Sequence, residues 1–236
     1  MRAVASTLRL HLNQRTTTFL APINVAAIVA VVSILISLVF WRAGSQPGSE
    51  GWISGSQSNP GIIYALAGYL IYLGVASVAT TFPFALTLGA TRRAFVAGTL
   101  LWNATMAIYV AVLFAVLLAI ELVTDHWFVG FYIFDIAALG AGDFGRLFTI
   151  VISGVLTALT VGGVFGASWM RYGARGPQLI AAGLVLAIAI LLIILIPQAA
   201  EILRALQPWW LAIAAGVVVI LAATGTWLLL RRASVR

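Results

Sequence analysis

The sequence predicts an all-α integral membrane protein with six transmembrane helices. Apolar residues make up 63% of the chain and charged residues 8%, whereas soluble domains have roughly 45–50% and about 25%. Six apolar runs each approach or exceed the ~20 residues that a helix needs to cross the hydrocarbon. A 236-residue water-soluble globule would need a charged exterior, so lipid is the expected solvent.

The first 18 residues carry three arginines among leucines, and Leu8 and Leu12 lie four residues apart. We expect residues 1–18 to form a short amphipathic helix in the membrane interface. The next run, 19–41, is uncharged and long enough to span. We interpret it as a retained first span rather than the short apolar core of a cleaved signal peptide, which leaves residues 19–236 as one six-span transmembrane domain.

The other five spans and two unusual connections follow from the same pattern. The segment 127–134 is apolar but too short to cross, so we expect it to lie on or dip into the outer leaflet. The segment 198–207, between Pro197 and Pro208, has the spacing of a short interfacial helix. The remaining spans are expected at residues 61–82, 95–120, 147–169, 179–196 and 209–230.

The arginines predict the orientation. Ten of the 13 fall on the N-terminal segment, on the second and fourth connections, and on the C-terminal tail. Since positive charge is retained in the cytoplasm, both termini and these connections are expected on the cytoplasmic side. The acidic residues all fall on the other side: Glu50, Glu121, Asp125, Asp135, Asp143 and Glu201.

Several functional classes have little support. The chain has neither cysteine nor lysine, so thiolate chemistry and the lysine of a phosphate-binding loop are missing. The net charge of +7 is explained by topology, since no basic helical stripe or RNA-binding motif accompanies it. No histidine or acid lies within a span beside Ser153 to activate it as a nucleophile, which makes an intramembrane enzyme the weakest hypothesis.

The stretch 81–100 is the most informative. Pro83 is expected to end or kink the second helix, and an apolar segment followed by Gly89 and two arginines lies at the cytoplasmic edge. The residues concerned are Leu86, Leu88, Gly89, Ala90, Thr91, Arg92 and Arg93. They form either an ordinary basic connection or a docking element for a cytoplasmic partner.

This layout resembles the permease subunits of bacterial ABC transporters of the type-2 exporter class. The shared features are six spans, a basic amphipathic N-terminal segment, a Gly-x-Thr-Arg-Arg turn at residues 89–93, and an amphipathic element before the last span. The resemblance covers the whole chain as a layout, although the larger outer insert here lies between spans three and four.

The resemblance implies a function and partners. Residues 86–95 would form a coupling helix that contacts a separate ATP-binding subunit in the bacterial cell membrane. ATP and magnesium would bind that partner, while this chain would carry no cofactor, metal or catalytic residue. A second permease copy, identical or similar, would complete the pathway. Arg92 and Arg93 would pair with acids of the ATPase. The alternative is a non-transporting membrane scaffold or sensor subunit.

Other polar and small residues receive structural interpretations first. Asp125, His126, Asp135 and Asp143 match no metal-ligand spacing, and we favour a solvated rim. Glu121 is expected to reach the headgroups from the end of its helix. Asn24, Asn103, Thr105, Thr157 and Thr160 are expected to hydrogen-bond within or between helices, with a few open as pathway-lining residues. Gly162 and Gly166 form a Gly-x-x-x-Gly pair, either for packing within the chain or for a dimer interface.

Overall fold

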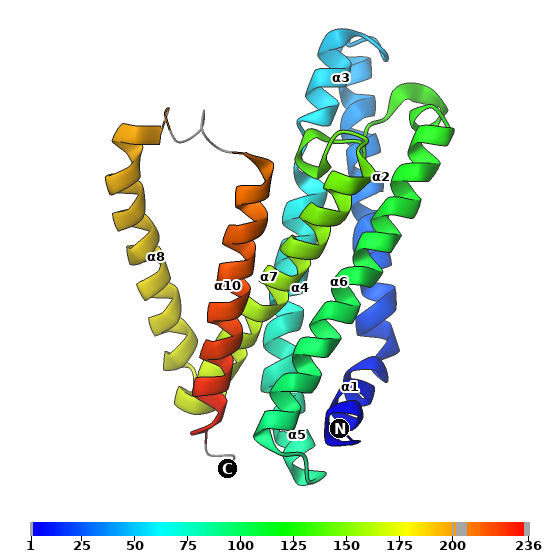
Figure 1. Cartoon of the computed structure of the whole chain (residues 1–236). Helices are drawn as coiled ribbons and strands as arrows, with labels where there is room; N and C mark the ends of the chain where they lie inside the picture. Colours follow the sequence, from blue (N-terminus) through cyan, green and yellow to red (C-terminus); the bar gives the residue numbers. More distant parts are fainter. Residues whose placement is uncertain (1, 200, 202–206, 234–236) are drawn as a thin grey trace.

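The computed structural model describes residues 2–199, 201 and 207–233, and the regular elements within these ranges are helices (Figure 1). In the described part, six helical segments are long and apolar enough to cross a membrane, which confirms the predicted all-α, multi-pass fold. The α-helices are α1 (Arg2–Leu12), α2 (Ala21–Arg42), α3 (Glu50–Gln57), α4 (Gly61–Ala79), α5 (Thr81–Thr87), α6 (Arg92–Val123), α7 (Phe144–Tyr172), α8 (Arg175–Leu195) and α10 (Pro208–Leu230). Short turns of other helix types are η1 (Thr16–Leu20), η2 (His126–Gly130), η3 (Ala137–Leu139) and η4 (Ile196–Gln198).

One element differs from the sequence-based expectation. The helix α3 was not predicted; the Ser49 hydroxyl caps it by accepting the Trp52 backbone N–H at 3.3 Å. The second span is broken between α4 and α5, as expected from Pro83. Pro83 has no N–H to bond the carbonyl of Ala79, four residues earlier, so the helix is interrupted there. The interfacial helix expected at 198–207 lies largely outside the described residues.

The helix α7 is the centre of the bundle and contacts α4, α6 and α10. Glycines allow the closest of these contacts. A Cβ atom on Gly162 would lie 2.2 Å from the Ile71 carbonyl oxygen, and one on Gly166 would lie 2.6 Å from that of Val75. On the facing helix, a Cβ on Gly74 would lie 2.4 Å from the Leu159 carbonyl oxygen. The Gly-x-x-x-Gly pair therefore packs α7 against α4 within one chain, and the alternative of a dimer interface at these glycines is wrong.

The two ends of the bundle differ in charge. The helix α1, the C-terminal end of α10 and α5 lie at one end, which we call the basic end, and α3 lies at the other, the acidic end (Figure 1). The basic end holds Arg9, Arg15, Arg92, Arg93, Arg171, Arg175, Arg231 and Arg232. The acidic end holds Glu50, Glu121, Asp125, Asp135 and Asp143.

The N-terminal helix α1 packs on α6 at the basic end. Its buried stripe consists of Thr7 and His11, one turn apart, with Leu8 and Leu12 partly buried beside them. A Cβ on Gly98 of α6 would lie 2.6 Å from Cβ of Thr7, so glycine is required for this close approach. The segment 1–18 thus includes the expected helix, and one face of that helix is covered by protein.

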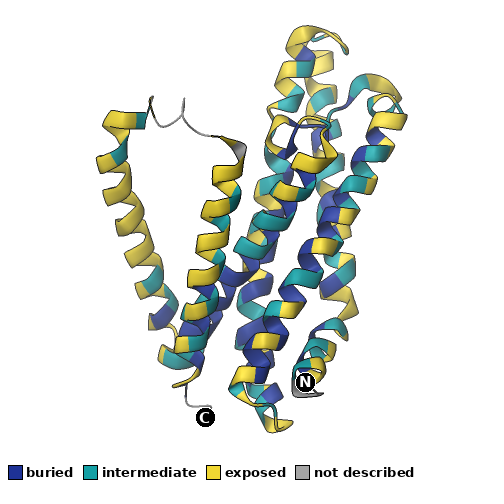
Figure 2. Cartoon of the chain, viewed as in Figure 1, coloured by how far each residue is buried: buried dark blue, intermediate teal, exposed yellow. Residues whose placement is uncertain are grey.

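The helix α8 stands apart from the rest. Its buried residue is Gly176, at the end that adjoins α7, where a Cβ would lie 2.4 Å from the Ser168 carbonyl oxygen. Beyond this contact α8 leans away from α10 toward the acidic end, and its ribbon is almost entirely exposed (Figures 1 and 2). Beyond this contact, the apolar side chains of α8 are therefore exposed rather than packed against the other helices.

Candidate functional site

The basic end carries the turn that sequence analysis singled out. The helix α5 ends at Thr87, and Gly89 adopts φ of +83°, a backbone conformation that favours glycine. The Thr91 hydroxyl then accepts the Ala94 N–H at 3.2 Å and caps the start of α6 at Arg92. Residues 86–95 are therefore a helix end, a turn and a helix start, so no single helix spans this segment as expected, while its coupling role stays a prediction.

Both arginines of the turn face the C-terminal end of α10. Nη1 of Arg92 donates to the carbonyl oxygens of Leu230 at 2.9 Å and Arg231 at 2.6 Å. These groups belong to the last turn, where carbonyls lack helical partners and attract positive charge. The guanidinium of Arg93 lies 5.8 Å from the ring centre of Trp227. Contacts within the chain thus engage both residues that were expected to meet acids of a partner.

Apolar side chains of α5 and the turn divide into an anchored and an exposed group. Phe82 and Phe95 are fully buried and meet edge to face, with ring centres 5.1 Å apart. Leu86 is partly buried against the same cluster. Phe84 and Leu88, by contrast, are 53% and 62% exposed. The turn therefore presents two large apolar side chains on a rigid, packed base.

The base of the turn connects the helices at the basic end. The buried cluster around Phe82 and Phe95 includes Val78 of α4, Ala167 of α7 and Leu230 of α10. Leu10 of α1, with Leu86, Ala90 and Trp227, packs against it from the side. A displacement of the turn would therefore be transmitted to α1, α4, α6, α7 and α10 together.

The histidine of α1 completes this end. His11 is 2% exposed, stacks on Trp102 with ring centres 4.8 Å apart, and its Nε2 lies 3.1 Å from the Thr99 hydroxyl. Burial lowers the pKa of His11 to about 4, because the charged imidazolium loses its hydration. At neutral pH an uncharged histidine thus holds α1 on α6.

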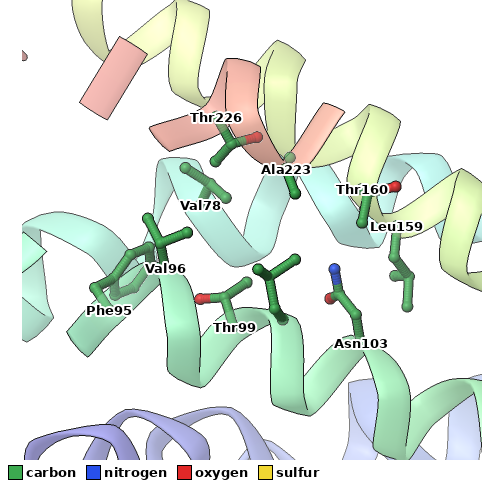
Figure 3. A pocket seen from close by; sticks show the side chains of 11 residues that line it. Val78, Phe95, Val96, Thr99, Asn103, Leu159, Thr160, Ala223 and Thr226 are labelled. Carbon is green, nitrogen blue, oxygen red and sulfur yellow. The ribbon is translucent and has the colours of Figure 1, made fainter. Parts of the chain in front are cut away.

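Figure 3 shows a small cavity between α4, α6, α7 and α10, near the basic end. Its volume is about 20 Å³, enough for one water molecule. The side chain of Asn103 faces it, and Oδ1 of this residue is buried with no hydrogen-bond partner among the described residues. Thr160 also lines it but donates to the Leu156 carbonyl oxygen of its own helix. The cavity suits a bridging water and is too small for a transported substrate.

At the acidic end, Glu121 is fully buried rather than directed toward headgroups, so that expectation is wrong. Its carboxylate accepts the backbone N–H groups of three consecutive loop residues at 2.9–3.1 Å, and the indole N–H of Trp127 at 3.0 Å. The backbone donors are Ile133, Phe134 and Asp135. Four N–H groups offset the loss of water around the charge. Glu121 thus fastens the loop to the end of α6.

The loop 124–143 folds onto the bundle, whereas its segment 127–134 was expected to lie on or dip into the outer leaflet. Phe131, Ile133 and Phe134 are buried, and Phe134 meets Phe114 of α6 edge to face at 5.6 Å between ring centres. The loop begins with four consecutive residues in the left-handed region, Asp125, His126, Trp127 and Phe128, with φ from 49° to 65°. Such backbone is strained for side chains other than glycine.

The four residues considered as a metal cluster do not assemble into one group. Nε2 of His126 lies 3.1 Å from Oδ2 of Asp135, and Nδ1 lies 3.7 Å from Oδ1 of Asp125. Asp143 caps α7 by accepting the Arg146 backbone N–H at 3.0 Å. Among the described residues, no three histidine, cysteine or acidic side chains are grouped as metal ligands would be.

Sequence reasoning missed Phe84, His11 and the role of Glu121. Phe84 follows Pro83 directly and lies on the exposed side of a short helix, which a residue pattern alone does not indicate. Glu121 had a usable signal, since a buried acid followed by an apolar loop needs polar partners, which the backbone N–H groups of that loop can supply.

No protein-family model, no curated protein and no solved structure matches this chain.

Proposed function

We propose that this chain is the transmembrane permease subunit of an ATP-driven ABC exporter in a bacterial cell membrane. A separate ATP-binding subunit docks at the basic end, which lies in the cytoplasm with both termini. The arginine distribution supports this orientation, because positively charged connections remain on the cytoplasmic side. The six spans and the resemblance in layout support the permease assignment.

The observation that carries the proposal is the exposed pair Phe84 and Leu88 at the basic end, where Arg93 is also exposed. Large apolar side chains exposed at a charged end of the molecule, on a rigid base, are typical of a protein-binding surface. In the proposed complex these two side chains enter an apolar pocket of the ATPase. Arg92 keeps its position on α10 and acts as a structural link rather than as a partner for acids.

The mechanism follows from the packing of the turn. ATP and magnesium on the partner subunit close the ATPase, and the turn moves with it. Since the cluster around Phe82 and Phe95 joins five helices, the displacement is passed to the bundle as rigid-body motion. The substrate is hydrophobic or amphipathic, because the spans carry almost no charge.

The small volume of the cavity has a consequence for where the substrate path lies in the assembled transporter. A chain whose interior cavity among α4, α6, α7 and α10 holds about 20 Å³ provides no substrate path there. The path therefore forms between this chain and a second permease, identical or similar. The same observation favours the alternative, a non-transporting scaffold or sensor subunit, whose partner would bind the same turn without hydrolysing ATP.

Affinity purification of the tagged chain from its native cells tests the proposal. An ABC ATPase should co-purify and hydrolyse ATP in a vanadate-sensitive manner. Leu88→Asp and Phe84→Asp should each reduce its recovery at least tenfold, because they place charge in an apolar contact. Ala174→Asp, in the exposed turn between α7 and α8 at the same end, is the matched control and should not.

Two results would contradict the proposal. Recovery of a partner without ATPase activity would favour the scaffold or sensor. Recovery of an ATPase equally well by Leu88→Asp, Phe84→Asp and the unchanged chain would place its docking site elsewhere.

A further inference from the structure

A groove at the acidic end is lined by hydroxyl groups. It lies between the end of α2 and the helix α3, with Tyr132 of the loop at one side, and its volume is about 430 Å³. That volume falls within the usual range of small-molecule sites. We call it the serine groove, after Ser33, Ser37, Ser45 and Ser56 in its lining.

The hydroxyl groups of Ser33 and Ser37 have no hydrogen-bond partner among the described residues. The two serines lie one turn apart on α2. Other helical serines satisfy themselves: Ser77, Ser153 and Ser168 donate to carbonyls of their own helices at 2.6–2.8 Å. Ser33 is only 9% exposed, so its hydroxyl is largely shielded yet open to the groove.

The depth of these serines along α2 raises the free-energy cost of a hydroxyl group that has no hydrogen-bond partner. Ser33 lies nine residues before the end of α2 at Arg42, which is about 14 Å along a helix and well inside a hydrocarbon layer of about 30 Å. Lipid tails offer no hydrogen bonds at this depth, so a ligand or water must supply them. The groove thus brings polar groups from the interface down toward the apolar layer.

The lining also restricts the chemistry of the ligand. Its described residues include no acidic and no basic one, so they offer nothing to balance a phosphate or an ammonium group. Aromatic rings of Phe40, Trp52 and Tyr132 border it. Trp52 is held in place, since its indole N–H donates to the Gly130 carbonyl oxygen at 2.6 Å. Aromatic faces with uncharged hydroxyl groups match a sugar ring, which has apolar faces and a polar edge.

We infer that the serine groove binds the uncharged sugar head of a glycolipid. The hydroxyl groups of the head meet Ser33 and Ser37, and the sugar ring packs against Phe40 and Tyr132. The acyl chains leave along the exposed apolar side of α2, where Ile36 is 44% exposed. This binding site does not depend on the ATPase partner, and it adds a lipid ligand to the proposed function.

The purified chain can be tested in phosphatidylglycerol nanodiscs doped with monoglucosyldiacylglycerol, with bound lipid measured by native mass spectrometry. Wild type should retain the glycolipid over equally abundant diacylglycerol, which lacks the sugar, and over phosphatidylglycerol. Ser33→Ala/Ser37→Ala should reduce glycolipid occupancy about tenfold, and Ser37→Leu should abolish it by filling the groove. Ser153→Ala, whose hydroxyl bonds its own helix, is the matched control and should leave occupancy unchanged.

Equal retention of glycolipid, diacylglycerol and phosphatidylglycerol would overturn the inference, as would a double alanine variant that binds like wild type. Unchanged helical circular dichroism would establish that a variant is folded, and the alanine pair removes only two oxygen atoms. Since no ATPase is present, failure here leaves the permease proposal untouched, and failure of co-purification leaves this one untouched.

Discussion

The consecutive spans α7 and α8 are joined by two residues, Gly173 and Ala174, yet they have opposite surroundings. The helix α7 lies among α4, α6 and α10, and three of its buried residues are Gly162, Gly163 and Gly166. The helix α8 is built almost entirely of leucine, isoleucine, valine and alanine, and it is exposed beyond its first residues.

The difference shows that apolar residues of a transmembrane helix can indicate two different environments, namely protein and lipid. Lipid tails are as apolar as leucine, so a run of large aliphatic residues gains no advantage by contacting another helix. Small residues allow backbones to approach, and van der Waals contact then holds the helices together. Small residues on α7 therefore indicate contact with protein, and large ones on α8 indicate contact with lipid or with another chain.

The most direct test of the difference between α7 and α8 is to replace one glycine on each helix by valine. Gly162→Val should destabilise the chain by about 3 kcal/mol or more, because the added carbon collides with the α4 backbone. A Cβ on Gly183 of α8 would have no atom of the described residues within 4 Å, and Gly183→Val should change stability by less than about 0.5 kcal/mol. Unfolding in SDS, followed by circular dichroism, measures both. Equal effects would contradict the distinction between the two helices.

A second prediction asks whether tight packing extends from the helices to the acidic-end loop. Glu121→Gln should cost about 2–3 kcal/mol, since the amide places N–H donors against N–H donors of the loop. Glu50→Gln, on an exposed residue at the start of α3, is the control and should cost less than about 0.5 kcal/mol. If Glu121→Gln unfolds at the wild-type SDS concentration, the loop is not fastened by this carboxylate.

A third prediction concerns the basic end and has the smallest effect. With a pKa of about 4 when α1 is packed and about 6.5 when it is free, His11 favours docking fully above pH 6.5. Docking then weakens as the pH falls from 6.5 toward 4, because the free helix takes up the proton first. The loss should reach about 2 kcal/mol at pH 5.

Hydrogen exchange of α1 amides at pH 7.5 and pH 5, corrected for the intrinsic rate, measures that loss. His11→Gln keeps a hydrogen-bonding side chain without titrating, so its exchange should show no extra acceleration at pH 5. The same acceleration in both proteins would assign it to another group.

The spans could be predicted from the sequence because lipid imposes length and apolarity on each of them independently. The path of the chain between spans could not. Apolar residues 127–134 are compatible with burial in lipid or in protein, and the choice depends on Glu121, which gathers the backbone of a loop up to 14 residues later. Periodicity contains no information about such a contact.

The candidate site, like the fold, could be predicted from the sequence only in part. Gly89, Thr91 and the two arginines were predicted to lie in a connection between two spans, and a turn is present there. Their partners were not predictable, because Arg92 donates to carbonyls 138 and 139 residues away. A positive charge indicates which side of the membrane it occupies, but not which group it binds.

The acidic-end loop begins with left-handed backbone, and this conformation is unfavourable for L-amino acids. Residues 125–128 trace the mirror image of an ordinary helical turn, so each L-amino acid there costs about 1–2 kcal/mol that a glycine or a D-amino acid would not. Phe128 is 85% exposed and has little packing to lose. The four N–H bonds to Glu121 oppose this cost. A strained stretch of backbone is therefore held in place by the hydrogen bonds of a single carboxylate.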